Sequence, residues 1–299
     1  MGREYKRLMV YMFRCFKQVA IYSAYFLLFI VIIRTFFLDI FRIPSNSMED
    51  QLNIGDIIVV NKFSYSNITA SFGYSQNPGF NEIFVFKNDI KDPTIYVKRC
   101  IGLPGQTIKI IDGEVYINGL PISEKKTVKH YYQIWAKNAR LVEAEISKAK
   151  NIEISRKYPK YIFASLNMEL VSKIKEQGEI DSIKIAINVE KPIREQLTMM
   201  GINEEIQQMP SLKLPHKGMT IRLDENTPEE YFNIIKKFEE KSLEKDGNSY
   251  FLNRQLVKKY VFDDDYYFMM GDNRDNSVDS RYYGLIPRKL FIGHYIFKI

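Results

Sequence analysis

TIKIIDGEVYINGLPI, residues 107–122, is the stretch that decides the fold class, because apolar and polar residues alternate along it between two turn signals. Alternation with a period of two is typical of β-strands that bury one face. Asp112-Gly113 and Asn118-Gly119 are dipeptides that favour two-residue type I′ hairpin turns. The stretch therefore predicts a meander of antiparallel strands.

Similar strand patterns lie on both sides of this meander. They are DIIVVNKF (56–63), EIFVFK (82–87), IYVKRCIGL (95–103), KKYVFDDDYYFMM (258–270) and FIGHYIFKI (291–299). All are rich in the β-branched and aromatic residues that favour strands. We expect a mainly β, antiparallel core that is interrupted and then completed, with residues 39–124 as its first part and 259–299 as its second.

Residues 125–258 have a different character. Lys- and Glu-rich helical patterns such as LNMELVSKIKEQ (166–177) alternate there with short strand patterns such as SIKIAINV (182–189). They predict an α+β insertion, in which we identify no catalytic motif. One helix is predicted to have Thr227 as its N-cap and Pro228 in its first position.

Composition narrows the functional classes. The chain has 299 residues, 45% of them hydrophobic, which is enough for one large domain or two modest ones. Its net charge of +7 suits nucleic acid or an anionic membrane. We expect no nucleic-acid partner, because acidic residues lie among the basic ones and neither zinc-finger spacing nor an aromatic RNA-binding strand occurs. Cys15 and Cys100 lie far apart, so we expect neither a structural disulfide nor a metal site.

An apolar run near the start predicts a membrane anchor. Residues 19–38 would span about 30 Å as a helix, the thickness of a bilayer's hydrocarbon core. Bulky residues follow, where a cleavable signal peptide needs small ones, so we expect an uncleaved anchor. Five basic residues and one acidic residue precede the run. The positive-inside rule then predicts a cytoplasmic N-terminus, residues 1–18, and an exported body after residue 38.

Several familiar catalytic arrangements are missing from the sequence. The three histidines are scattered, and no HExxH pairing is present to bind zinc. No serine lies in a G-x-S-x-G elbow, and no glycine-rich loop could cradle a phosphate. We expect no metal and no cofactor. A Ser-His-Asp triad stays open, because triads assemble in space.

A neutral lysine can also activate a serine. The pKa of lysine in water is about 10.4, so a working base needs burial that lowers it by roughly 2 units. Lys98 is a candidate, because it lies in a strand pattern where Lys98 and Arg99 point to opposite faces. A solvated strand lysine is the commoner alternative. The polar stretch 271–281 is either a loop with its own Asx turns or a rigid support for a site.

Three stretches together resemble the bacterial type I signal peptidases, also called leader peptidases. They are IPSNSM (43–48), YVKRCIGLPG (96–105) and GDNRDNSVDSR (271–281), and the anchor with RTF (34–36) at its outer edge matches as well. The resemblance implies a membrane-bound serine endopeptidase with a signal-peptidase-like β core and a Ser/Lys dyad. Such an enzyme is a hydrolase of protein secretion that removes signal peptides from preproteins after small-x-small sites.

The resemblance also implies residue roles. Ser47 would be the nucleophile and Lys98 its general base. The Ser47 backbone N–H and the Ser45 hydroxyl would form the oxyanion hole, the two serines pointing the same way from an extended strand. Ser277 would hydrogen-bond the Lys98 amine and orient it. The other supporting residues would be Asp279 and Arg281 in the final loop, and Asp272 paired with Arg99. The residues implied to contact substrate are Phe41, Ile43, Pro44, Met48, Tyr96 and Val97.

The chain departs from the family pattern beside the nucleophile. Glu49-Asp50-Gln51-Leu52 stands where the family usually has x-Pro-Thr-Leu, and Asn46 replaces a common glycine. Cys100 is expected to fill the core and not to act as a rival nucleophile.

The implied partners are signal-peptide-bearing preproteins and the lipid bilayer. The implied location is the bacterial cytoplasmic membrane, crossed once, with the catalytic domain on its outer face. Two alternatives stay open. One is a self-cleaving Ser/Lys protease, against which the anchor counts. The other is a catalytically silent, membrane-tethered binding protein on the same fold.

Overall fold

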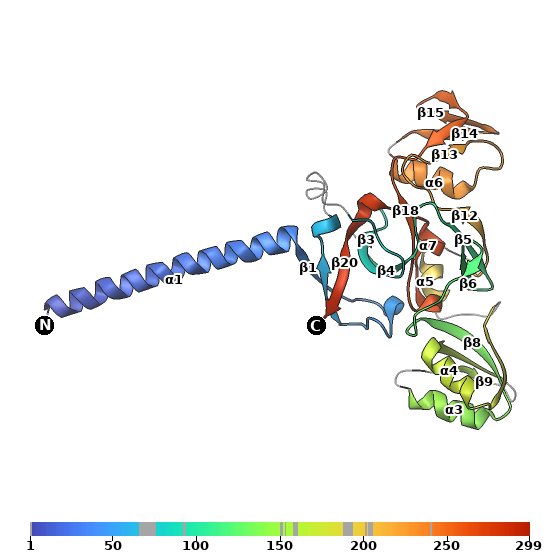
Figure 1. The fold of residues 1–299 in the computed structure, drawn as a ribbon, viewed down its shortest axis with the longest axis horizontal. Helices are drawn as coiled ribbons and strands as arrows, with labels where there is room; N and C mark the ends of the chain where they lie inside the picture. Colours follow the sequence, from blue (N-terminus) through green and yellow to red (C-terminus); the bar gives the residue numbers. More distant parts are fainter. Residues whose placement is uncertain are drawn as a thin grey trace.

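A computed structural model describes residues 2–65, 76–91, 94–149, 152, 154–157, 161–187, 194–200, 202, 206–239 and 241–299. Helix α1 (Gly2–Phe36) projects away from the rest of the molecule (Figure 1). Its segment Met9–Phe36 is long and apolar enough to cross a membrane and is not buried against other residues. The helix ends before residue 38, the last residue of the predicted span, because Leu38 already begins a strand.

The central sheet has seven antiparallel strands in the order β1-β2-β20-β3-β4-β18-β19. Their bounds are β1 (Leu38–Arg42), β2 (Ile57–Asn61), β3 (Ile83–Lys87), β4 (Ile95–Gly102), β18 (Tyr266–Met270), β19 (Ile286–Pro287) and β20 (Phe291–Lys298). The mainly β, antiparallel fold class is confirmed. Strand β1 was not predicted, because its sequence continues the apolar run of the anchor.

The meander also forms as predicted. Strands β5 (Thr107–Ile111), β6 (Glu114–Ile117) and β7 (Leu120–Pro121) pair in sequence order. Asp112 and Gly113 have φ angles of 50° and 81°, and Asn118 and Gly119 have 52° and 84°. Positive φ at both central positions is what a type I′ turn requires.

Residues 125–258 contribute to several sheets. Strand β12 (Met209–Lys213) joins the meander by pairing with β5. A four-stranded sheet in the order β11-β8-β10-β9 forms a lobe with two helices (Figure 1). The elements of this lobe are β8 (Lys129–Ala136), α3 (Ala139–Lys148), β9 (Ile154–Lys157), β10 (Tyr161–Asn167), α4 (Met168–Glu176) and β11 (Ile180–Ile185).

A second group of elements lies on the opposite side of the central sheet (Figure 1). It comprises β13 (Thr220–Arg222), α6 (Glu229–Phe238), β14 (Leu243–Asp246), β15 (Ser249–Leu252), β16 (Gln255–Val257) and β17 (Lys259–Val261), while α5 (Arg194–Met199) lies elsewhere. Helix α6 begins at Glu229, with Pro228 as its cap residue. The predicted N-cap Thr227 is wrong, because its hydroxyl instead bonds the backbone N–H of Asp224 and the backbone carbonyl of Arg222.

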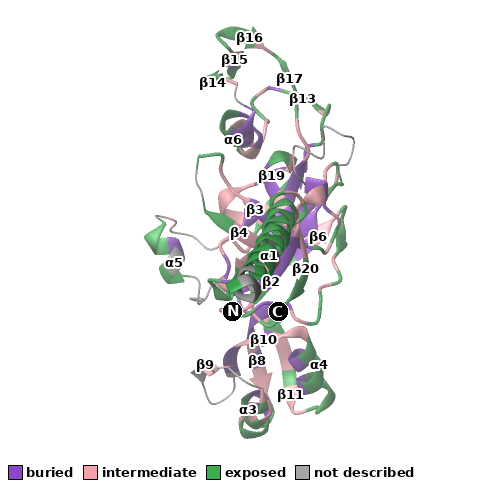
Figure 2. Ribbon diagram, turned by 90° about the vertical axis from the view of Figure 1, so that its left-hand side faces the viewer, coloured by how far each residue is buried: buried purple, intermediate pink, exposed green. Residues whose placement is uncertain are grey.

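Burial is concentrated in the central sheet, whereas α1 is exposed (Figure 2). The largest apolar cluster joins this sheet to the meander and α6. A separate apolar cluster packs around the stretch IPSNSM (43–48) and includes Ile43, Met48, Leu52, Ile58 and Val85. This second cluster fixes the turn that follows β1 to the face of the sheet. The short helical elements are η1 (Asn46–Met48), η2 (Phe63–Tyr65), η3 (Arg274–Asn276), α7 (Ser280–Tyr283) and η4 (Arg288–Leu290).

Candidate active site

Ser47 lies in the single 3₁₀ turn η1 that follows β1. The next residue, Met48, is buried and holds the turn in the apolar cluster. Ser45 precedes the turn in extended conformation, and its hydroxyl oxygen lies 3.3 Å from that of Ser47. The expectation that both serines lie on one extended strand is wrong, but the two hydroxyls are neighbours.

Lys98 lies on β4, where it pairs with Phe84 of β3. Its Nζ donates a hydrogen bond of 2.5 Å to the Ser47 hydroxyl oxygen. Only 4% of the residue is exposed. This burial lowers the pKa of Lys98 to about 8, against the opposing effect of the Asp279 and Asp272 carboxylates. A buried amine with this pKa is neutral in a large share of molecules near pH 8.

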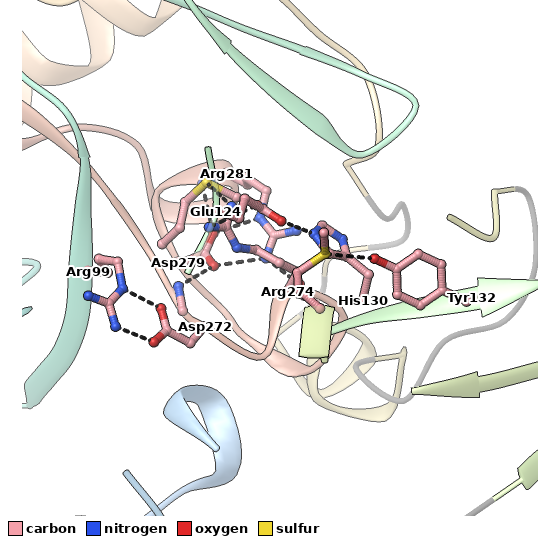
Figure 3. Close-up of polar contacts among 11 residues, drawn as sticks. Arg99, Glu124, His130, Tyr132, Asp272, Arg274, Asp279 and Arg281 are labelled. Carbon is pink, nitrogen blue, oxygen red and sulfur yellow. Dashed lines mark hydrogen bonds and ion pairs between the residues drawn. The ribbon is translucent and has the colours of Figure 1, made fainter. Parts of the chain in front are cut away.

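The loop after β18 is tied to the sheet by paired charges (Figure 3). Arg99 donates two hydrogen bonds, of 2.7 and 2.5 Å, to the Asp272 carboxylate. Asp279 accepts bonds from the Gly271 backbone N–H at 3.0 Å and from the Arg281 guanidinium at 2.8 Å. Burial alone would raise the pKa of Asp279, but Arg281 and the backbone bond hold it below its usual value. The structure thus forms the predicted Asp272–Arg99 pair and also pairs Asp279 with Arg281.

Ser277 is fully buried in the same loop, yet its hydroxyl has no hydrogen-bond partner in the structure. The expected bond between Ser277 and the Lys98 amine is therefore not formed here. Gly271 packs against Ser277 closely: a Cβ at this glycine would lie 2.2 Å from the Ser277 hydroxyl oxygen and 2.5 Å from the Ser47 carbonyl oxygen. The loop and the serine turn leave no room for a side chain between them.

A cavity of about 230 Å³ opens beside the two hydroxyls. The predicted substrate residues that line it are Ile43, Pro44, Met48, Tyr96 and Val97, and further lining residues include Thr94, Ile95, Asn276 and Val278. Phe41 is not among them and instead packs on the apolar cluster. Strand β18 pairs with β4 between Arg99 and Gly102, and the cavity lies beside the preceding part of β4.

Cys100 is not among the residues that line the cavity. Cys100 is buried, and burial raises the pKa of its thiol well above the ordinary value. Among the described residues, no group of three or more His, Cys, Asp or Glu side chains could hold a metal ion.

Comparison with known proteins identifies the class. Residues 16–162 and 187–299 match the family described as signal peptidase, peptidase S26. This match covers most of the chain and makes it a serine peptidase. The chain belongs to the signal peptidase family, peptidase S26.

Its relatives include signal peptidase I of Buchnera aphidicola subsp. Acyrthosiphon pisum (strain APS), 30% identical over 88% of this chain and 68% of the relative. Signal peptidase I of Aquifex aeolicus (strain VF5) is 28% identical over 91% and 82% of the two chains. A crystal structure of a signal peptidase I from Enterococcus faecalis V583 has 17% identity and a TM-score of 0.28, covering 73% of this chain and 97% of that one.

Proposed function

We propose that the chain removes signal peptides from preproteins with Ser47 as its nucleophile and Lys98 as its general base. The 2.5 Å hydrogen bond between the two side chains carries this proposal. A base must lie within hydrogen-bond reach of the proton that it takes, and its pKa works best near the operating pH. Lys98 meets both conditions. Its Nζ lies 2.5 Å from the Ser47 hydroxyl oxygen, and burial lowers its pKa to about 8.

In the proposed mechanism neutral Lys98 takes the proton of the Ser47 hydroxyl as its oxygen attacks the scissile carbonyl carbon. The Ser47 N–H and the Ser45 hydroxyl stabilise the resulting oxyanion. The lysine then gives its proton to the departing amine of the mature protein, which leaves an ester on Ser47. Water, deprotonated by Lys98, hydrolyses this ester and releases the signal peptide with a free carboxylate.

The substrate would bind as an extended strand along the edge of β4 at Ile95–Lys98. A strand that adds to a sheet edge gains backbone hydrogen bonds, and alternate side chains enter pockets. The cavity of about 230 Å³ suits small side chains at the −1 and −3 positions, with Met48 at one wall. We assign Asp279, Arg281, Asp272 and Arg99 to support of the loop. We assign to Ser277 the orientation of the Lys98 amine, through a hydrogen bond that is not formed in this structure.

We also propose the membrane topology. Segment Met9–Phe36 would cross the cytoplasmic membrane once, with the N-terminus inside, because basic residues precede the apolar run. The catalytic cavity would then lie outside, close to the membrane surface where signal-peptide cleavage sites emerge.

The test is cleavage of a full-length preprotein by the detergent-purified chain, with mass spectrometry to locate the cut. Wild type should cut after a small-x-small site, and Ser47→Ala and Lys98→Ala should each abolish cleavage while the fold persists. Ser45→Ala should slow cleavage on the order of 10²-fold through loss of one oxyanion donor. Near-normal turnover by Lys98→Ala would refute the dyad. No cleavage by folded wild type would favour a tethered binding protein.

A further inference from the structure

The turn that carries Ser47 is held by the α+β lobe as well as by its own neighbours. Lys129, the first residue of β8, is only 4% exposed and donates a 2.9 Å hydrogen bond to the Glu49 carboxylate. Glu49 follows the turn by one residue. A side chain from the lobe therefore reaches within two residues of the proposed nucleophile.

Glu49 also contacts Asn273, which lies in the loop after β18. The same oxygen of Glu49 that bonds Lys129 accepts a 3.1 Å hydrogen bond from the Asn273 side-chain amide. The amide nitrogen also donates to the Asn46 carbonyl at 3.2 Å, and the Asn273 backbone N–H donates to the Ser47 carbonyl at 3.1 Å. Asn273 thus donates hydrogen bonds to two of the three carbonyls of the turn, those of Asn46 and Ser47.

The Asn46 carbonyl matters most, because it belongs to the same peptide group as the Ser47 N–H. A peptide group is planar and trans, so fixing the direction of its carbonyl also fixes the direction of its N–H. This N–H is one of the two proposed oxyanion donors, beside the Ser45 hydroxyl. An oxyanion donor acts well only when it is oriented in advance, since reorganisation during the reaction costs rate.

The backbone beside the turn is also held by the lobe. Asp50 has a φ of 72°, a left-handed conformation that is uncommon for residues other than glycine and that proline cannot adopt. Its carboxylate accepts a 2.7 Å hydrogen bond from Asn167, the last residue of β10. Two lobe residues therefore hold the two acidic residues that follow Ser47-Met48.

We propose that Lys129 is a positioning residue for the hydrolysis, acting through Glu49 and Asn273 to orient the Ser47 N–H. The proposal rests on the proposed function, in which that N–H stabilises the oxyanion. It gives the lobe a part in catalysis: the lobe supplies the ammonium group that anchors the chain of hydrogen bonds. Lys129 itself contacts neither the cavity nor the reacting atoms.

The test measures kcat and KM of the full chain on a preprotein, for wild type and variants. Lys129→Met, which keeps the length of the side chain, should lower kcat on the order of 10- to 100-fold. KM and the pH midpoint of activity should not change, because neither the cavity nor Lys98 is altered. Lys129→Arg should retain most of the kcat. The Glu49→Gln/Lys129→Met double variant should lose little more than Lys129→Met, because both changes break one chain of contacts.

Lys173→Met is the matched control, because Lys173 is an exposed lysine of the same lobe that pairs with Glu169 one helical turn away. It should behave as wild type. If Lys129→Met does not fold, kcat of the Glu49→Gln/Lys129→Met double variant tests the positioning role. This variant removes both charges of the pair and leaves neither unpaired. A wild-type kcat in the deciding variant, or a rise in KM alone, would overturn the positioning role while Ser47-dependent cleavage stands. Cleavage by Ser47→Ala would instead overturn the proposed function.

Discussion

The titration of Lys98 should determine how the activity depends on pH. Burial lowers its pKa to about 8, and only the neutral amine can take the Ser47 proton. Below pH 8 the amine is mostly protonated, so kcat/KM should rise tenfold per pH unit until the pH reaches about 8 and then level off. A pH profile of preprotein cleavage measures this. A profile that is flat from pH 6 to 9, with Ser47-dependent cleavage, would contradict a lysine base.

Gly271 is the residue whose side chain the site cannot accommodate. In Gly271→Ala the new Cβ would meet the Ser277 hydroxyl and the Ser47 carbonyl at 2.2 and 2.5 Å, far inside van der Waals contact. The loop and the serine turn must separate, so we expect cleavage to fall on the order of 10²-fold or more. Gly2→Ala, where no atom lies within 4 Å of the new Cβ, is the control. Equal activity of the two variants would show that the two segments can shift apart freely.

At the residue scale the sequence predicts which side chains of the proposed dyad meet, but it does not predict all the residues that hold them. Ser47, Lys98 and the Arg99–Asp272 pair come together as their motifs indicate. The role of Lys129 was missed, because a lysine in a lysine-rich stretch gives no signal until a partner 80 residues away is placed beside it. The left-handed backbone of Asp50 was also missed, since no residue type requires it there.

The ion pair that joins β4 to the loop after β18 should contribute strongly to the stability of the fold. Arg99 and Asp272 are 173 residues apart in sequence, and both are buried. Asp272→Asn would leave the guanidinium without its carboxylate, which typically costs 3–5 kcal/mol, about the cost we expect here. Thermal unfolding in detergent should show a large drop in Tm. Asp263→Asn breaks an exposed pair with Lys241 and should cost at most about 1 kcal/mol. Similar Tm values for both variants would contradict the assignment.

Elements with a strong local signal are predicted correctly, and those defined by their surroundings are not. The meander follows from its turn dipeptides, which determine the backbone at two positions each. Strand β1 was missed because LDIFR is apolar enough to extend the anchor, and only pairing with β2 makes it a strand. The helical and strand patterns of residues 125–258 predict an α+β region. They do not predict that β12 pairs with β5 of the meander, because these strands lie about 100 residues apart and no local pattern indicates the pairing.

For the molecule as a whole, the junction between anchor and core should set where the cavity lies relative to the membrane. The Lys62 ammonium donates to the Arg34 carbonyl in the last turn of α1 and to the Asp39 carboxylate, each at 3.1 Å. The rings of Phe37 and Phe63 stack with centroids 5.0 Å apart. These contacts join the end of α1 to the segment that follows β2, and we expect them to limit movement between the helix and the core.

We therefore expect Lys62→Met to affect membrane-bound substrates selectively. In lipid vesicles, cleavage of an embedded preprotein should slow several-fold, because the cavity is no longer held at one height. Cleavage of a soluble peptide that spans the cut site should not change, since Lys62 lies outside the cavity. The exposed-lysine variant Lys173→Met should show neither effect. Equal slowing on both substrates would indicate damage to the catalytic core.

The strand order of the central sheet has a consequence for how the enzyme comes into being. β20 lies between β2 and β3, although every other strand of the sheet precedes it in the sequence. A ribosome that makes the chain from its N-terminus delivers Ser47 and the anchor first, and the strand that joins the two halves of the sheet only after all the others. Until β20 is made, the proposed nucleophile Ser47 is present while the two halves of the sheet stay unjoined. The central sheet is therefore closed only by the last of its own strands to be synthesised.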